Sequence, residues 1–225
     1  MNALLPALLD LAIEIQQIPA PTFQETARAA FLHARFEREN LTHISTDDLG
    51  NVYACLPGRG TAAPVVISAH TDTVFPAGTP LHITRTPETI AGPGIGDNSL
   101  AVAGLFAIVW GLRARGVSLP GDVWLAANVG EEGLGDLKGM RAVVARFGDQ
   151  PRAYLILEGM ALGQVYHAAL GVRRYRVTLE TEGGHSWVDF GRPSAIHELA
   201  ALITRLTRLP LPRLPRASLN VGTLQ

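Results

Sequence analysis

The chain has 225 residues, of which 47% are hydrophobic and 17% are charged, so it can bury a core large enough for a folded domain. Its 19 basic and 20 acidic residues give a formal net charge of -1, so it lacks the basic surface expected of a nucleic-acid-binding protein. These numbers exclude a mainly disordered chain and make a nucleic acid an unsuitable partner.

Cysteine usage and the N-terminal composition indicate a reducing compartment. Cys55 is the single cysteine, which excludes an intramolecular disulfide and a cysteine-based metal cluster. Residues 1–18 carry Asp10 and Glu14 and have no basic region or small-residue cleavage site, so they do not resemble a signal peptide. The best apolar run, Leu100–Leu112, is shorter than the roughly 18 residues of a membrane span. We expect a cytoplasmic protein without a membrane partner.

Two helices are predicted before the first strand. Apolar residues recur at helical spacing over Leu4–Ile18 and stop at Pro19, which predicts an amphipathic helix. The segment Thr22–Glu25 matches a capping box, because a threonine is followed three residues later by a glutamate. It predicts a second helix that runs to about Glu39.

Short apolar runs follow. Ile44–Thr46 and Val52–Leu56 flank Asp48–Asn51, whose Gly and Asn tolerate a tight turn, so a β-hairpin is predicted. Beyond it, apolar runs alternate with helical segments, which is typical of a mostly parallel sheet flanked by helices. The predicted class is α/β, with a first domain over residues 1–170. Its further elements are strand Val65–Ser68, helix Ser99–Arg113, strand Val123–Asn128, helix Lys138–Phe147 and strand Tyr154–Leu157.

The pattern changes near Gly171. Strands are predicted at Val165–Leu170 and, by its alternation, at Arg174–Leu179. A helix over Ser194–Leu209 and a strand over Ala217–Val221 complete a β-α-β unit. We therefore predict a second, smaller α+β domain, of which residues 171–225 form the first part.

His70 and Asp72 come directly after the predicted strand that begins at Val65. Open α/β sheets bind ligands at the carboxyl ends of their parallel strands. An imidazole can bind a metal ion there while a nearby carboxylate holds the proton of its other nitrogen. A lone His-x-Asp is weak evidence, because such a pair is more often structural.

Asp97 stands in the glycine-rich segment Gly92–Ser99, just before a predicted helix. Three interpretations remain open here. A phosphate-binding loop is disfavoured, because Asp97 occupies the place of the third glycine of a dinucleotide-binding motif and no Gly-Lys-Ser/Thr follows. Asp97 could instead bridge two cations, or it could simply cap the helix.

Two further acidic positions follow strand ends. Glu131 and Glu132 come just after the strand that ends at Asn128, where adjacent carboxylates repel each other unless a cation or a shared proton intervenes. One could be a ligand and the other a general base, although a solvated acidic loop is the alternative. Glu158 ends an apolar run, and a buried carboxylate needs a cation or hydrogen bonds.

These positions should converge on one crevice, because they occupy successive strand ends of one sheet. Histidine and carboxylate ligands without a thiolate suit Zn, Mn or Co. A bridging carboxylate would hold two ions about 3.5–4 Å apart. The sequence therefore predicts a centre with two divalent metal ions.

The order of the motifs resembles that of the co-catalytic zinc peptidases and deacylases. This family includes glutamate carboxypeptidase, aminoacylase, peptidase T, acetylornithine deacetylase and succinyl-diaminopimelate desuccinylase. The motifs span nearly the whole chain and are, in order, His70-x-Asp72, Asp97, Glu131-Glu132, Glu158 and Gly183-Gly184-His185-Ser186. The resemblance implies a metallopeptidase-like catalytic domain followed by a lid or dimerisation domain.

The resemblance also implies a metal-binding role for four of the matching residues. Asp97 would bridge two metal ions, His70 and Glu158 would complete one site, and Glu132 would belong to the other. Zinc is the expected metal, with Co or Mn as alternatives. Glu131 would be the general base that takes a proton from the attacking water and delivers it to the leaving amine.

Three more roles follow from the resemblance. Asp72 would orient His70. His185, on the lid domain, would reach the active site of a partner subunit and stabilise the oxyanion, which implies a homodimer. Asn220 matches a position near the substrate carboxylate.

The expected function is metal-dependent hydrolysis of an amide or peptide bond in a small peptide or an N-acyl amino acid. Aminopeptidase, carboxypeptidase, dipeptidase and deacylase activities all fit this site. The chain ends before the family's second metal-binding histidine, so we expect a weak second metal site. The alternative is therefore a catalytically silent metal-binding or dimerisation module of the same fold.

Overall fold

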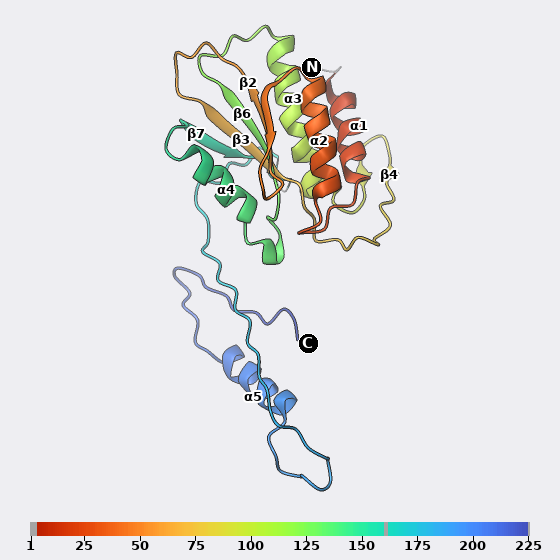
Figure 1. Ribbon diagram of the computed structural model, residues 1–225, viewed down its shortest axis with the longest axis vertical. Coiled ribbons are helices and arrows are strands. Elements are labelled where there is room, and N and C mark those ends of the chain that lie inside the picture. Colours follow the sequence, from red (N-terminus) through yellow and green to blue (C-terminus); the bar gives the residue numbers. More distant parts are fainter. Residues whose placement is uncertain (1–3, 160–161, 225) are drawn as a thin grey trace. The chain divides into compact units, whose positions relative to one another are not determined.

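The computed structural model describes residues 4–159 and 162–224, and the chain divides into two compact units, Met1–Val165 and Tyr166–Gln225. In the first unit, helices cover a five-stranded sheet (Figure 1). The elements of this unit in chain order are α1 (Leu4–Gln16), α2 (Thr26–Arg38), β1 (Thr42–Thr46), β2 (Val52–Leu56), β3 (Val65–His70), β4 (Thr84–Arg85), β5 (Ile90–Ala91), η1 (Ile95–Ser99), α3 (Leu100–Ala114), β6 (Val123–Asn128), η2 (Gly133–Gly135), α4 (Lys138–Phe147) and β7 (Ala153–Ile156).

The main sheet has the strand order β1-β2-β6-β3-β7. β3 pairs in parallel with β6 and β7, whereas β2 is antiparallel to both β1 and β6. The sheet is mixed with mostly parallel strands, and the predicted α/β class is confirmed. The predicted hairpin is confirmed as well, because β1 and β2 pair across a turn that contains Gly50 at a φ of 97°.

The register of the parallel strands brings their carboxyl ends to one edge of the sheet. His70, the last residue of β3, pairs with Asn128, the last residue of β6. On the other side of β3, Ser68 pairs with Ile156, the last residue of β7. The loops that follow these three strands therefore leave the sheet at the same edge.

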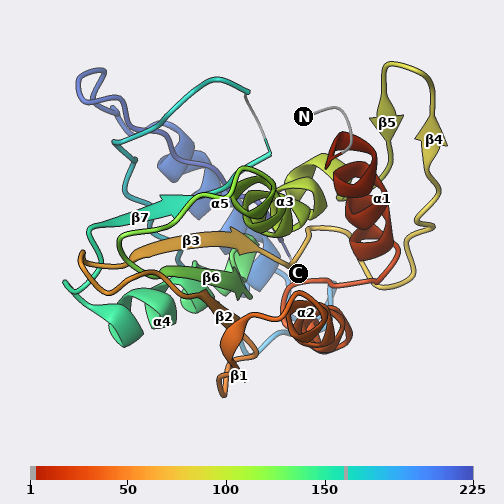
Figure 2. The same ribbon diagram turned by 90° about the horizontal axis from the view of Figure 1, so that it is seen from above.

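Alternate strand residues contribute to two apolar cores, one on each face of the sheet. The larger core packs α1, α2 and α3 against the face that includes Ile67 and Leu125. The smaller core packs α4 against the face that includes Val66 and Ala126. Figure 2 shows α4 on the opposite side of the sheet from α1 and α3. Successive strand residues point to opposite faces, so each strand contributes side chains to both cores.

Most predicted elements of the first unit form close to their predicted bounds. β6 and α4 match the predicted strand Val123–Asn128 and helix Lys138–Phe147. β4 and β5 form a small antiparallel pair beside α1 that was not predicted (Figure 2). Two residues per strand are too few to show a period in the sequence.

The predicted capping box at Thr22–Glu25 does not form. α2 begins at Thr26, and its N-cap residue Glu25 makes no side-chain capping hydrogen bond. The Thr22 hydroxyl instead donates to Asp72 Oδ2 at 2.9 Å, and Glu25 Oε1 accepts from the Gly130 N–H at 3.0 Å. Tertiary partners therefore replace the local motif.

The segment Ile95–Ala114, which consists of η1 and α3, is long and apolar enough to cross a membrane by length and composition. This differs from the expectation based on the shorter run Leu100–Leu112. Half of its most apolar window is buried inside the fold, and α3 supplies Val102, Leu105 and Phe106 to the larger core. A core helix passes the same test, so this observation is weak evidence for a membrane span.

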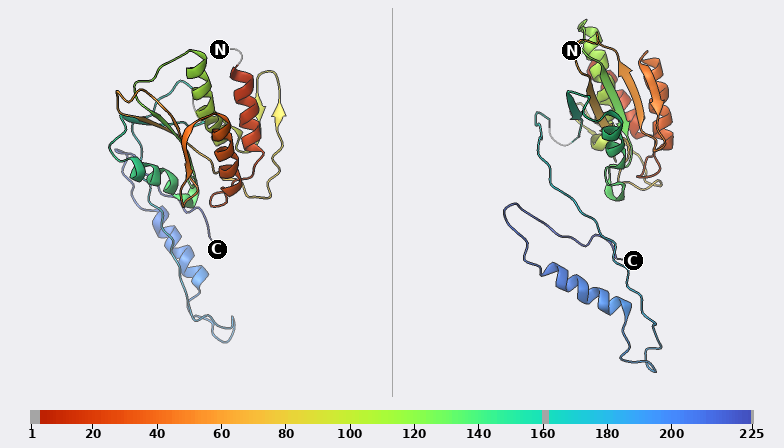
Figure 3. Two further views of the ribbon diagram at one scale, coloured as in Figure 1. Left: turned by 45° about the horizontal axis from the view of Figure 1, so that its top comes forward. Right: turned by 60° about the vertical axis from the view of Figure 1, so that its left-hand side comes forward.

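The second unit has one helix among residues 166–224, which is α5 (Ala195–Thr207) (Figure 3). α5 matches the predicted helix Ser194–Leu209. The strands predicted at Val165–Leu170, Arg174–Leu179 and Ala217–Val221 do not form, and this part of the prediction is corrected. A strand needs a hydrogen-bonded partner, which an alternating pattern alone does not supply. The predicted domain boundary between residues 170 and 171 stays a prediction.

Candidate active site

His70 lies at the centre of a cluster at the carboxyl edge of the sheet. Its side chain is 3% exposed, and its Nε2 lies 3.0 Å from Asp97 Oδ1 and 3.6 Å from Glu158 Oε2. Its Nδ1 lies 3.1 Å from the Asp72 carbonyl oxygen and 3.5 Å from Asp72 Oδ1. The structure thus brings three of the predicted site residues around one imidazole.

Asp97 lies in the irregular turn η1, before α3. Its backbone angles are non-helical, with φ at -117° and ψ at 95°. The N-cap residue of α3 is Ser99, and no side-chain capping hydrogen bond is present at either η1 or α3. The capping role considered for Asp97 therefore has no support, and its carboxylate is free to face His70.

A close backbone approach places Glu158 beside the Asp97 turn. A Cβ atom on Gly159 would overlap the carbonyl oxygen of Gly96, so only glycine fits at position 159 without a shift. Asn98 Nδ2 also donates to the Leu157 carbonyl at 3.1 Å. These contacts join the end of β7 to η1 on both sides of the carboxylate pair.

Asp72 positions the loop that carries Glu131 and Glu132. The Glu131 N–H donates to Asp72 Oδ1 and the Glu132 N–H donates to Asp72 Oδ2, both at 2.9 Å. The Thr22 hydroxyl donates to the same Oδ2. The Asp72 side chain is fully buried, so it connects β3, β6 and the segment before α2 without competition from water.

Burial and hydrogen bonding shift the pKa values of His70 and Asp72 in opposite directions. Burial lowers the pKa of His70, but its contacts with Asp72 and Glu158 outweigh this effect and raise it to about 10. Burial raises the pKa of Asp72, but hydrogen bonds from His70, the two glutamate N–H groups and Thr22 lower it to about 2. The Asp72 carboxylate is therefore held in its charged form, and the groups around His70 favour positive charge at its position.

The remaining carboxylates are crowded. Burial, together with neighbouring carboxylates, raises the pKa values of Glu131 and Glu132, and His70 opposes the shift. Burial also raises the pKa of Glu158, but hydrogen bonds from His70 and the Gly159 N–H outweigh it and lower the value. Like charges held this close favour a cation between them.

Among residues 4–159 and 162–224, two overlapping groups of side chains could each hold a metal ion. His70 belongs to both, once with Glu131 and Glu132 and once with Asp97 and Glu158. Within each group the ligand atoms lie within 4.8 Å of one another. An imidazole with several carboxylates and no thiolate suits Zn, Mn or Co, so the residues fit a divalent metal centre. The same carboxylates would repel a phosphate, which argues against the phosphate-loop interpretation.

The other two predicted site residues, His185 and Asn220, belong to the second unit. His185 makes its described contacts inside that unit: its N–H donates to Asp189 Oδ2 at 2.9 Å, and its Nδ1 accepts from the Trp187 N–H at 3.3 Å. Asn220 is exposed. Their roles stay predictions that follow from the resemblance.

Arg28 is a buried residue near the site. It was not singled out from the sequence. It is 2% exposed, and its Nη1 donates to the Thr71 carbonyl at 2.7 Å, while its Nε donates to the Ile18 carbonyl at 3.0 Å. Burial lowers its pKa to about 10, and the nearby charge of Asp72 opposes this shift. The available signal was a charged residue on the apolar face of α2.

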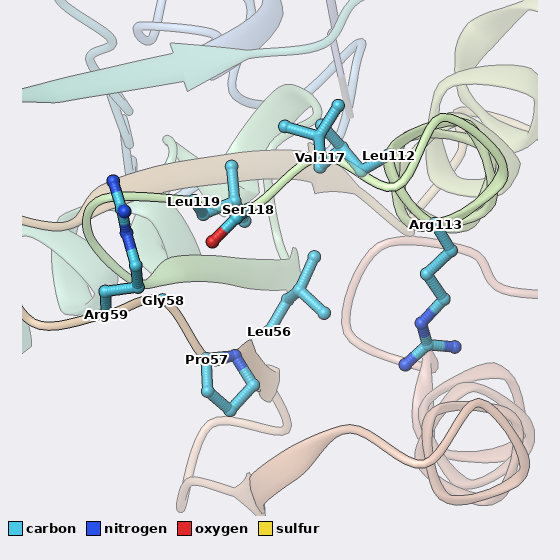
Figure 4. Close-up of a pocket in the computed structure, with 9 residues that line it drawn as sticks. All are labelled: Leu56, Pro57, Gly58, Arg59, Leu112, Arg113, Val117, Ser118 and Leu119. Carbon is cyan, nitrogen blue, oxygen red and sulfur yellow. The ribbon is translucent and has the colours of Figure 1, made fainter.

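A cavity of about 350 Å³ opens beside the cluster. Glu132 and Thr22 form its polar wall, while Pro21, Val74 and Phe75 contribute apolar surface. A second cavity, of about 200 Å³, lies beyond the start of β6 and the end of β2, and is lined by Leu56–Arg59, Leu112, Arg113 and Val117–Leu119 (Figure 4). Only the first of these two cavities touches the cluster.

A family model described as Peptidase family M20/M25/M40 matches residues 66–218, which is more than half of the chain. The chain belongs to this peptidase family. The matched region begins inside β3 and includes all seven predicted catalytic and metal-binding residues of the M20 chain. No curated protein sequence matches it.

Solved structures share the fold of this M20 chain. Aminopeptidase PepT from Bacillus cereus has a TM-score of 0.58 and 21% identity, over 67% of this chain and 42% of its own. The dipeptidase Dug1p from Saccharomyces cerevisiae has a TM-score of 0.58 and 15% identity, over 69% and 39%. Aminopeptidase APDkam598 from Desulfurococcus kamchatkensis has a TM-score of 0.57 and 13% identity, over 73% and 66%. The M20 chain thus spans about two fifths of the length of PepT and Dug1p.

Proposed function

We propose that this M20 chain carries the catalytic centre of a metal-dependent hydrolase that cleaves an amide or peptide bond. The observation that carries the proposal is the position of His70 Nε2, 3.0 Å from Asp97 Oδ1 and 3.6 Å from Glu158 Oε2. Glu131 and Glu132 complete the cluster around the same imidazole. Membership of a peptidase family supports the same reaction class.

His70, Asp97, Glu132 and Glu158 would hold two divalent ions, with Asp97 as the bridge and zinc as the expected metal. These ions would polarise the substrate carbonyl and lower the pKa of a bound water molecule. Glu131 is left for proton transfer, and its raised pKa suits a group that accepts a proton from water and delivers it to the leaving amine. Asp72 holds His70 in one orientation and fixes the Glu131 backbone.

Small peptides are the proposed substrates, with N-acyl amino acids as the related class. The named activities of PepT and Dug1p, an aminopeptidase and a dipeptidase, support short peptides. The cavity beside Glu132 is at the small end of ligand pockets, which span roughly 300–1,000 Å³. A short substrate fits such a volume better than a folded protein does.

The second unit would serve as a lid and a dimer contact. In that arrangement His185 would stabilise the oxyanion in the active site of a partner subunit, and Asn220 would contact the substrate carboxylate. The resemblance to the family supports both roles. We also propose a cytoplasmic location, which the single cysteine supports.

The test is metal stoichiometry by elemental analysis of the purified chain beside Asp97→Ala, with hydrolysis of dipeptides and N-acyl amino acids measured on the same samples. Two metals per chain with turnover, both lost in Asp97→Ala, would support the proposal. Glu88→Ala is the matched control, because Glu88 is an exposed carboxylate of the same first unit outside the cluster. Binding of one metal without turnover would favour a silent metal-binding module, and full metal retention by Asp97→Ala would overturn the bridging role.

A further inference from the structure

Four consecutive backbone N–H groups after β6 each donate to a side-chain oxygen. The Val129 N–H donates to Asn51 Oδ1 at 2.9 Å, and the Gly130 N–H donates to Glu25 Oε1 at 3.0 Å. The next two N–H groups, those of Glu131 and Glu132, donate to the two oxygens of Asp72. We call residues 129–132 the acidic loop.

The three acceptor side chains come from three separate parts of the fold. Asn51 precedes β2, Glu25 precedes α2 and Asp72 follows β3. Asn51 and Asp72 are 0% exposed and Glu25 is 5% exposed. Because water does not reach these oxygens, the Val129 and Gly130 N–H groups would stay without a partner if they lost their acceptors.

The carbonyl groups of the acidic loop are held from the other side by α4. The Lys138 N–H donates to the Gly130 carbonyl and the Gly139 N–H donates to the Val129 carbonyl, both at 3.1 Å. Gly130 has a φ of 60°, and a Cβ atom there would lie 2.7 Å from Lys138 Cγ. The backbone that leads into Glu131 therefore has little freedom to move.

We propose that Glu25 is a positioning residue for the reaction, and that it acts through the Gly130 N–H to fix where the Glu131 and Glu132 carboxylates point. Thr22 has the same role through Asp72 Oδ2. The inference rests on the proposed function, because it assumes that Glu131 transfers the proton. Misplacing a catalytic group by about 1 Å can lower a rate by about a hundredfold, so such support has a measurable effect.

The test compares Glu25→Ala with Glu25→Gln in the complete 225-residue chain. Glutamine keeps an oxygen that can accept the Gly130 N–H, whereas alanine removes it. We expect Glu25→Ala to lower kcat about tenfold with KM changed less than about twofold, because the effect is on proton transfer and not on substrate binding. Glu25→Gln should stay within about threefold of the unmodified chain.

Two further measurements do not depend on turnover. Amide hydrogen exchange at residues 130–132 should accelerate at least about tenfold in Glu25→Ala and little in Glu25→Gln. Titration with Zn²⁺ alone should show about tenfold weaker binding in Glu25→Ala, because loss of a residue that supports a metal ligand commonly has this effect. In Thr22→Val, exchange at residues 130–132 should also accelerate and Zn²⁺ binding should also weaken, each by a smaller factor. Thr22→Ser is its conservative partner and should change both little.

Glu37→Ala is the matched control, because Glu37 is an exposed carboxylate on α2 that contacts His33 and not the acidic loop. Equal effects of Glu25→Ala and Glu25→Gln, or unchanged exchange at residues 130–132, would overturn the inference. An increase in KM at constant kcat would also overturn it. If the unmodified chain hydrolyses nothing, the proposed function fails for this chain, and the exchange and Zn²⁺ results still decide the role of Glu25.

Discussion

At each end of the main sheet a glycine packs directly against a backbone carbonyl, but the two contacts have different consequences. At the end that carries His70, Gly159 approaches the Gly96 carbonyl so closely that no Cβ fits. At the opposite end, Gly58 approaches the Gly121 carbonyl in the same way. Only the first approach brings carboxylates together, because Glu158 and Asp97 flank it.

The two ends of the sheet differ in the charged groups that lie there. At the His70 end, the buried Asp72 and four exposed or half-buried carboxylates surround one imidazole, and Asp72 also accepts from two backbone N–H groups. At the opposite end, the cavity beside Gly58 is lined by apolar residues, one serine and two arginines, and by no carboxylate. A sheet edge becomes a candidate site when polar groups converge on it, and a cavity alone does not make one.

The largest effect is expected from Asp72→Ala. The substitution removes the acceptors of the Glu131 and Glu132 N–H groups, and each loss costs about 1–3 kcal/mol. We expect the free energy of unfolding to fall by about 3 kcal/mol in urea denaturation, together with loss of Zn²⁺ binding. Asp72→Asn keeps one acceptor oxygen and should lose about half as much stability. Intact Zn²⁺ binding in Asp72→Ala would contradict this account.

Gly159→Ala and Gly58→Ala form a matched pair at the two ends. Both add a methyl group where a carbonyl oxygen already lies, so both should destabilise the fold by about 1–3 kcal/mol. Only Gly159→Ala should weaken metal binding, by about tenfold or more, because it forces Glu158 away from Asp97. Isothermal titration with Zn²⁺ measures this difference, and equal affinities in the two variants would show that the ends are not distinct.

The reactivity of Cys55 measures, without any mutation, whether the end of the sheet near Gly58 opens. It is 1% exposed, and burial, with Asp122 nearby, raises its pKa to about 11. Since the thiolate is the reactive form, the fraction of it at pH 8 is about a hundredfold lower than for the thiol at its ordinary pKa. A thiol reagent should therefore react slowly with the folded chain and quickly in urea, with the folded rate rising as pH increases. Fast reaction at pH 8 would show that this end opens.

The smallest effect is expected from Arg113→Ala. Arg113 Nη1 lies 3.6 Å from Glu39 Oε2, and its side chain is 41% exposed, so the ion pair is screened by solvent. The free energy of unfolding should change by less than about 1 kcal/mol, and Zn²⁺ binding should not change. Any change in metal affinity would link the two ends in a way that the structure does not suggest.

Much of the first unit could be predicted from the sequence, because its strands and helices carry strong local patterns. β6 and α4 form at their predicted bounds, since each has a clear period and distinct flanking residues. The capping box at Thr22–Glu25 failed because both side chains have partners far away in the sequence. The strands predicted in the second unit failed because alternation marks a residue pattern, whereas a strand also requires a paired neighbour.

The candidate site shows the same limit. His70, Asp97 and Glu158 could be named because each follows a predicted strand or precedes a predicted helix. Glu25 and Asn51 could not be connected to the acidic loop, because their partners lie 105 and 78 residues away in the chain. Their local motifs, a helix start and a tight turn, already explained their presence.

The start of α2 has a consequence for any attempt to make this protein more heat-resistant. Glu25 occupies the N-cap position without capping the helix. A serine would not cap α2 there either, because the backbone at position 25 is helical (φ -85°, ψ -3°), whereas a capping residue is typically extended. The same change would free the Gly130 N–H and loosen the acidic loop. Because a buried N–H without an acceptor costs about 1–3 kcal/mol, replacing Glu25 would lower stability as well as loosen the loop, so efforts to raise heat resistance should leave position 25 unchanged.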